Sequence, residues 1–169
     1  MISLDLKEYN RTQHENTVVD IARRLSDSNV PYCFIKSSSL ALQGLPVNPN
    51  DIDILTTAEG AYDLQRALQP QGNLVKEVQY STDGMFGSYF GKLNLNGVQV
   101  EIIGEFTEKH SKGWKSNKKV LEERVFVYKN GCLIPVSSLQ GERESYEGLK
   151  REKDAVKRKV LNEIFSLKI

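Results

Sequence analysis

Five residues in the first third of the chain, Asp51-Ile52-Asp53-Ile54-Leu55, alternate between acidic and apolar side chains. Successive side chains of a strand point to opposite faces, so the pattern predicts a strand with two carboxylates on one face and isoleucines on the other. The isoleucines indicate burial, where unpaired carboxylates are costly. A divalent ion with oxygen ligands, such as Mg²⁺, relieves the repulsion between them. Asp51 and Asp53 are therefore predicted metal ligands; the alternative is an acidic pair that only marks a strand edge or turn.

A third carboxylate, Glu101, lies in the otherwise apolar run from Val98 to Ile103. This run follows Asn96-Gly97, the dipeptide that most strongly predicts a two-residue hairpin turn. If Glu101 points inward, it needs a partner and can join Asp51 and Asp53. If it points to solvent beside Gln99, which shares its face, it has no catalytic role. The local pattern leaves both orientations open.

Three serines, Ser37 to Ser39, follow the short apolar run from Val30 to Ile35 and precede a segment that ends at Gly44. Serine is a good helix N-cap and glycine a good C-terminal stop, so we expect a buried strand, a tight turn and a short helix. Hydroxyl groups and backbone N–H groups at such a turn can bind phosphate oxygens. Plain helix capping is the alternative role for the serines.

The remaining pattern predicts alternating helices and strands. We expect helices over residues 12–28 and 59–68, strands over 74–80, 88–95 and 98–103, a hairpin turning at Asn130-Gly131, a mobile loop or lid over 105–119, and helices from residue 138 onward. Residues 1–137 are thus predicted to form one domain, with residues 138–169 as a helical segment packed on it.

Composition excludes several classes of protein. The 169 residues carry 23 Lys+Arg against 22 Asp+Glu, so a strongly basic nucleic-acid binder is not expected. No run of 18 apolar residues predicts a membrane span, and the N-terminus has no signal-peptide pattern. Cys33 and Cys132 lie far apart in apolar runs and are predicted to be free thiols, which indicates a cytoplasmic protein. His14 and His110 are too few and too separated for a His-based zinc site.

Residues 35–44, followed by 50–55, resemble the signature of the DNA polymerase β-like nucleotidyltransferase superfamily, in particular its small stand-alone prokaryotic members of minimal or antibiotic-adenylyltransferase type. That signature is an apolar strand, Gly, then Gly or Ser, a short helix, an Asp-x-Asp strand and an acidic residue on a neighbouring strand. Residues 146–154 also resemble a helical segment of these proteins in which Arg and Lys approach the active site. The resemblance covers roughly residues 18–161 and implies an α+β fold, with a mixed antiparallel and parallel sheet flanked by helices and with C-terminal helices.

The resemblance implies a metal-dependent nucleotidyltransferase that moves a nucleoside monophosphate from an NTP to an acceptor hydroxyl and releases pyrophosphate. Asp51, Asp53 and Glu101 take the catalytic and metal-binding positions, for two Mg²⁺ ions or for Mn²⁺. Predicted nucleotide contacts are Lys36, Ser37, Ser38, Arg151 and Lys153. A solvated, charged helix face is the alternative for the last two.

The acceptor implied by the resemblance is a small hydroxylated molecule, a tRNA end or a protein side chain. Neither a membrane nor a specific DNA sequence is an expected partner, and a second copy of the chain, as a homodimer, is one that the sequence allows.

Two residues depart from the signature. Lys36 stands where the family has its first Gly, which lets the backbone approach the phosphates closely. A lysine there can obstruct this approach or reach the triphosphate with its cation. The basic residue often found before Asp-x-Asp is also replaced, by the segment 47–50. A catalytically degenerate member that binds nucleotide or a partner protein is therefore the alternative function. A third class, an RNA-binding module without chemistry, predicts salt-dependent RNA affinity that Asp51→Asn leaves intact.

We predict that Asp51→Asn or Asp53→Asn abolishes metal-dependent nucleotide binding or transfer and leaves the fold intact or slightly stabilised. Removing one charge relieves like-charge repulsion in the metal-free protein. Thermal melts without metal check the stability, and nucleotide binding with Mg²⁺ checks the site. Strong destabilisation of both variants would contradict this placement of the carboxylates.

Overall fold

The predicted Asp-x-Asp strand lies in the middle of a mixed sheet. The structure is a computed structural model that describes the backbone of residues 2–149 and 152–166, and side chains from residue 12 onward except those of 148, 149 and 153. Within this part of the chain the strands are β1 (Tyr32–Ile35), β2 (Asp51–Thr56), β3 (Asn73–Thr82), β4 (Phe86–Leu95), β5 (Val98–His110), β6 (Gly113–Ser116), β7 (Val125–Lys129) and β8 (Cys132–Val136). Their order is β3-β4-β5-β2-β1-β8-β7, with β6 paired to β5.

The central strand β2 runs antiparallel to β1 and parallel to β5. The register places Asp53 beside Ile35 of β1 on one side and beside Glu101 of β5 on the other. Asp51 pairs with Gln99. Because residues in register on neighbouring strands project from the same face, this pairing brings the three predicted carboxylates together.

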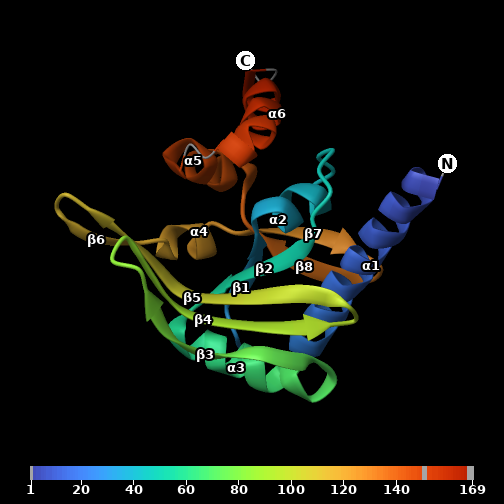
Figure 1. Cartoon of the computed structure of the whole chain (residues 1–169), viewed down its shortest axis with the longest axis horizontal. Helices are drawn as coiled ribbons and strands as arrows, with labels where there is room; N and C mark the ends of the chain where they lie inside the picture. Colours follow the sequence, from blue (N-terminus) through green and yellow to red (C-terminus); the bar gives the residue numbers. More distant parts are fainter. Residues whose placement is uncertain (1, 150–151, 167–169) are drawn as a thin grey trace.

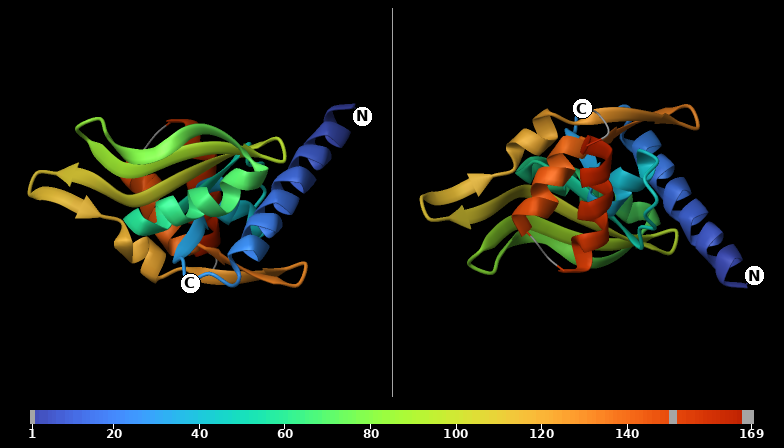
Figure 2. Two further views of the ribbon diagram at one scale, coloured as in Figure 1. Left: turned by 90° about the horizontal axis from the view of Figure 1, so that it is seen from below. Right: turned by 90° about the horizontal axis from the view of Figure 1, so that it is seen from above.

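The two faces of the sheet are covered by different helices (Figures 1 and 2). Ile52, Ile54 and Ile102 are fully buried in a core cluster with α1 (Ile2–Leu25) and α3 (Ala58–Leu68). The helices α5 (Leu139–Leu149) and α6 (Ala155–Ser166) lie over the opposite face, as the view from above shows. The carboxylates therefore face away from the core and toward the C-terminal helices.

Most predicted elements are confirmed, with shifted ends. The helix predicted for 12–28 begins at Ile2 and ends at Leu25, and the helix predicted for 59–68 begins at Ala58. The expected tight turn before the serines is reduced to Lys36, whose left-handed backbone leads directly from β1 into α2 (Lys36–Leu42), so the serines lie within the first turns of this helix. Two 3-10 helices, η1 (Gln69–Gln71) and η2 (Glu152–Asp154), complete the order with α4 (Lys118–Glu122).

Both predicted two-residue hairpins are present. Asn96 and Gly97 have φ values of 53° and 77°, and Asn130 and Gly131 of 49° and 78°, so both residues of each turn adopt the left-handed conformation of a type I′ turn. The mobile loop or lid predicted for 105–119 is wrong. β5 continues to His110 and pairs with β6, so this polar segment is an extended hairpin followed by α4.

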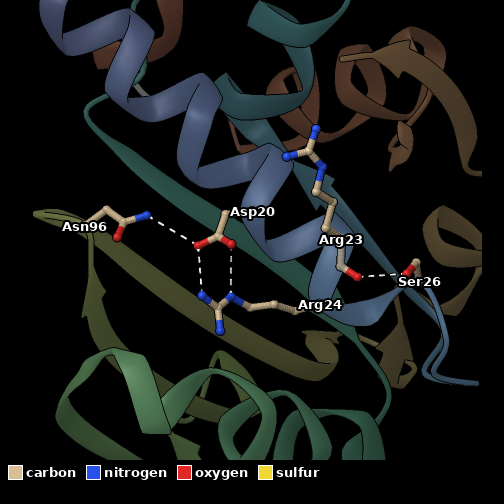
Figure 3. Close-up of polar contacts among 5 residues, drawn as sticks. All are labelled: Asp20, Arg23, Arg24, Ser26 and Asn96. Carbon is tan, nitrogen blue, oxygen red and sulfur yellow. Dashed lines mark hydrogen bonds and ion pairs between the residues drawn. The ribbon is translucent and has the colours of Figure 1, made fainter. Parts of the chain in front are cut away.

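The C-terminal end of α1 is attached to the sheet by polar contacts (Figure 3). Arg24 donates hydrogen bonds to both Asp20 oxygens at 3.1 and 3.2 Å, and Asn96 in the β4–β5 turn donates to Asp20 at 3.4 Å. The Ser26 hydroxyl donates to the Arg23 carbonyl and helps to end the helix. The contact between Asn96 and Asp20 links α1 to the end of the hairpin whose second strand carries Glu101.

The described residues form the predicted α+β architecture with C-terminal helices. None of the helices that the structure describes is long and apolar enough to cross a membrane. Cys33 and Cys132 are free, Cys33 being buried and Cys132 half-buried.

Candidate active site

Asp51, Asp53 and Glu101 form the centre of the candidate site. Each offers a carboxylate oxygen, and these oxygens all lie within 4.8 Å of one another. Glu101 thus points toward Asp51 and Asp53, which is one of the two orientations that the local sequence pattern left open. The Gln99 amide donates a hydrogen bond to Glu101 at 3.2 Å, and the Lys92 ammonium lies 3.8 Å from the same Glu101 oxygen. A set of three carboxylates on a rigid sheet fits a hard divalent cation.

The electrostatic strain of this cluster falls mainly on Asp53, which is 7% exposed. The pKa of Asp53 is raised to about 8, mainly by burial and also by a hydrogen bond shared with Glu101. The Lys36 cation opposes the shift, whereas the charges of Asp51 and Glu101 add to it. Without a cation, the site therefore favours a proton on Asp53 near neutral pH.

The three carboxylates line a cavity of about 500 Å³ between the sheet and the C-terminal helices. Its lining is Lys36, Ser37, Asn48, Asn50, Asp51, Asp53, Glu101, Tyr146, Asp154 and Lys157. The cavity combines acidic groups on the floor with hydroxyl groups and ammonium groups around them. Such a combination suits a phosphorylated ligand bound together with a cation.

Lys36 adopts a left-handed backbone conformation, with φ of 58°. An L-residue pays about 1 kcal/mol for this conformation, which glycine adopts freely. The structure therefore gives a physical reason for the glycine of the family signature: the chain turns sharply from β1 into α2 at this position. Lys36 takes a conformation that glycine adopts without strain, and its cation lowers the pKa of Asp53.

Glu142 of α5 holds this turn in place. Its carboxylate is 3% exposed and accepts hydrogen bonds from the Lys36 backbone N–H at 2.6 Å and from the Ser137 hydroxyl at 2.7 Å. Burial raises the pKa of Glu142, and these two hydrogen bonds oppose the shift. The C-terminal helix is thereby joined to the start of α2 through a buried side chain.

The three serines have different positions. Ser37 lines the cavity. Ser38 is fully buried, with its hydroxyl 2.9 Å from His14 Nε2 and donating to the Asp51 carbonyl at 3.2 Å. Ser39 donates to the Ser137 carbonyl. Ser38 is not among the described residues that line the cavity, and its hydroxyl supports the backbone of Asp51.

Two of the predicted nucleotide contacts, Arg151 and Lys153, are basic residues of the C-terminal segment. Arg151 lies outside the described residues, and the Lys153 side chain does too. Lys157, one turn further along, lines the cavity and lies 3.8 Å from Asp154. The sequence pattern singled out neither Lys157 nor Glu142 as a site residue. Glu142, Tyr146 and Leu149 share one face at helical spacing, a pattern that predicts packing but not a role in the site.

A second cavity, of about 450 Å³, adjoins the first along the same sheet face and shares Lys36 with it. Its floor is formed by residues that follow the acidic positions by two: Leu55 after Asp53 and Ile103 after Glu101. Ile35, Phe86, Phe106 and Val120 add to its apolar lining. Since alternate residues of a strand share a face, the same registers build both the acidic cavity and the apolar one.

This fold and acidic cavity define a protein of the nucleotidyltransferase type, and comparisons with known proteins agree. A Thermotoga maritima protein, TM1012, described as a candidate nucleotidyltransferase, is 36% identical with a TM-score of 0.78, over 90% of this chain and 95% of that one. The lincomycin-bound lincosamide adenylyltransferase LnuA shares 16% identity with a TM-score of 0.59, over 88% and 96% of the two chains. ANT(2'')-Ia, bound to adenylyl-2''-tobramycin, shares 9% identity with a TM-score of 0.58, over 86% of each chain.

The family model of aminoglycoside-2''-adenylyltransferases matches residues 17–161. The chain belongs to this family, and the predicted membership of the nucleotidyltransferase superfamily is confirmed. A comparison with curated protein sequences finds no significant match. Fold and family together support transfer of a nucleoside monophosphate.

We predict different effects for Lys36→Gly and Lys36→Ala. Both remove the ammonium group, so both should weaken binding of an NTP with Mg²⁺ by about tenfold or more, as expected for loss of one charge-assisted contact. Only glycine relieves the left-handed strain, so Lys36→Gly should be more stable than Lys36→Ala by about 1 kcal/mol. Calorimetric titration and urea denaturation measure the two effects. Tighter NTP binding by the glycine variant than by the natural chain would show that Lys36 obstructs the site.

The raised pKa of Asp53 predicts how stability depends on pH in the absence of metal. Between about pH 4 and pH 8 the unfolded chain loses the Asp53 proton while the folded protein keeps it, so the free energy of unfolding should fall as pH rises through this window. Asp53→Asn removes this contribution. Its free energy of unfolding should therefore exceed that of the natural chain by at least about 1 kcal/mol at pH 8, with a smaller difference at pH 4.

Urea denaturation in a chelating buffer at both pH values measures the difference. Glu142 titrates with the same sign, but it is present in both proteins and cancels in the comparison. A difference that is constant with pH would contradict the pKa shift of Asp53.

Proposed function

We propose that this protein transfers a nucleoside monophosphate from an NTP to a hydroxyl group of a small-molecule acceptor, with release of pyrophosphate and with dependence on Mg²⁺. The observation that carries this proposal is the acidic cluster: three carboxylate oxygens within 4.8 Å of one another in a cavity that also holds Ser37, Lys36 and Lys157.

The donor set fits a divalent metal, which we assign to Asp51, Asp53 and Glu101. All three are hard oxygen ligands, and the raised pKa of Asp53 supports a cluster that a cation would stabilise. When bound, the metal would neutralise charge that develops on the phosphate oxygens. Mn²⁺ is the alternative ion. Lys36 and Lys157 supply further positive charge from the rim of the cavity.

The residues of the chain then have separate roles. Ser37 and Lys36 bind the β- and γ-phosphates, beside the start of α2. Glu101 lies on the far side of β2 from α2. It takes the proton of the acceptor hydroxyl as the oxygen of that hydroxyl attacks the α-phosphorus. The bond from this phosphorus to the bridging oxygen breaks, and pyrophosphate leaves toward Ser37. This arrangement is consistent with an in-line displacement, in which nucleophile and leaving group lie on opposite sides of the phosphorus.

The apolar cavity supports a small molecule as the acceptor. It begins one strand repeat, about 7 Å, beyond the carboxylates, a distance suited to an acceptor whose hydroxyl reaches the acidic floor. Its mostly apolar lining favours an acceptor with a ring or alkyl portion over a nucleic acid. The neighbouring structures contain lincomycin or adenylyl-2''-tobramycin. A cytoplasmic location and a homodimer stay predictions from the sequence.

The test begins with thermal stabilisation by each of the four NTPs with Mg²⁺, which reports binding to the folded protein. Release of pyrophosphate is then measured with a panel of hydroxylated molecules that includes lincomycin and tobramycin. We expect stabilisation by at least one NTP, release that requires an acceptor, and loss of both with Asp51→Asn. The exposed variant Asp63→Asn, on α3 away from the site, is the matched control.

Two outcomes would favour the other functions. Binding of an NTP without release of pyrophosphate for any acceptor would identify the degenerate member. RNA affinity that falls steeply with salt and persists in Asp51→Asn would identify an RNA-binding module. No binding of any NTP, with or without Mg²⁺, would overturn the proposed function.

A further inference from the structure

Tyr146 is a buried tyrosine whose hydroxyl group has no hydrogen-bond partner among the described residues. The residue is 2% exposed and lies on α5, where it lines the acidic cavity. Buried hydroxyl groups are normally hydrogen-bonded, because burial without a partner costs free energy. An unpartnered hydroxyl that faces a cavity therefore indicates a group that a ligand satisfies.

The ring of Tyr146 has a separate, structural role. It packs in a cluster with Leu40 and Ala41 of α2 and Leu161 of α6, and so holds the C-terminal helices against the helix that begins at Lys36. The Lys157 ammonium lies 5.7 Å from the ring centre. This packing positions the hydroxyl without supplying a hydrogen-bond partner from the described residues.

The surroundings of the hydroxyl define the ligand group it suits. The Ser37 hydroxyl is close enough to affect the Tyr146 pKa but lies outside hydrogen-bonding geometry. Burial raises the pKa of Tyr146, and the charges of Glu142, Asp154 and Asp53 raise it further, so the group stays a protonated donor. It needs an acceptor oxygen in the cavity, beside Ser37 and Lys157.

The position of Tyr146 indicates which part of the substrate its hydroxyl contacts. Tyr146 lies against α2, which follows β1, whereas Glu101 is on β5, on the other side of β2. With the acceptor hydroxyl at Glu101, the pyrophosphate leaving group lies on the side of Ser37 and Tyr146. We propose that the Tyr146 hydroxyl donates a hydrogen bond to a β- or γ-phosphate oxygen of the bound NTP. This inference rests on the proposed function.

The test compares Tyr146→Phe with the natural chain. Phenylalanine keeps the ring and removes only the hydroxyl, and Tyr32→Phe, at another buried tyrosine outside the acidic cavity, is the matched control. With Mg²⁺, we expect Tyr146→Phe to weaken binding of the NTP about tenfold to a hundredfold, the range for a hydrogen bond to a charged group. Inorganic triphosphate should lose affinity by a similar factor. Tyr32→Phe should bind both as the natural chain does.

A second readout excludes a purely structural role. Since the hydroxyl has no hydrogen-bond partner among the described residues, the melting temperature of Tyr146→Phe without ligand should be equal to or higher than that of the natural chain. A lower melting temperature would show that the hydroxyl stabilises the fold and would overturn the inference. Equal affinity of both proteins for the NTP would also overturn it.

Comparing the NTP with inorganic triphosphate shows which part of the nucleotide the Tyr146 hydroxyl contacts. Weaker binding of the NTP with unchanged binding of inorganic triphosphate would place the contact on the nucleoside and overturn the phosphate assignment. If the natural chain binds no NTP, the proposed function and this inference both fail. If the natural chain binds and Tyr146→Phe binds equally, only this inference fails.

Discussion

The opposite faces of β2 place one physical constraint on the whole molecule. Ile52 and Ile54 are fully buried against α1 and α3, so a shift of β2 by one residue would drive Asp51 and Asp53 into the core. The apolar face thereby holds the acidic face in register. Parallel pairing with β5 then sets Glu101 beside Asp53, and the next residues on the same face of both strands, Leu55 and Ile103, form the apolar floor. The candidate site is in this sense the reverse side of the hydrophobic core.

Bringing three carboxylates together destabilises the protein without a cation. The cost appears at Asp53, where burial and the neighbouring carboxylates favour the protonated form. Lys36 and Lys92 offset part of this repulsion from either side of the cluster. Sites that bind a charged ligand are commonly destabilised in its absence. A bound cation relieves the repulsion between the carboxylates, and this relief contributes to its affinity.

The turn from β1 into α2 shows how the protein accommodates a residue that departs from its family's signature. Lys36 adopts the left-handed conformation that glycine takes freely, and Glu142 of α5 accepts a hydrogen bond from its backbone N–H. The C-terminal helices are consequently part of the site. Through Glu142 they hold the turn, and through Tyr146 and Lys157 they close the cavity above the carboxylates.

Local geometry explains which features the sequence determined by itself. Alternation predicted β2 and its two acidic residues, and the Asn-Gly pairs predicted both hairpins, since each depends on the conformation of a few adjacent residues. The hairpin of β5 and β6 escaped prediction because its polar side chains show no alternation between a buried and an exposed face. Only tertiary structure decided which way Glu101 points and which partners Ser38 bonds, namely His14 and Asp51. The same holds for the places of three residues of the C-terminal helices at the site: Glu142, Tyr146 and Lys157. They depend on contacts between segments far apart in the chain, and no local pattern states which buried side chain will meet which cavity.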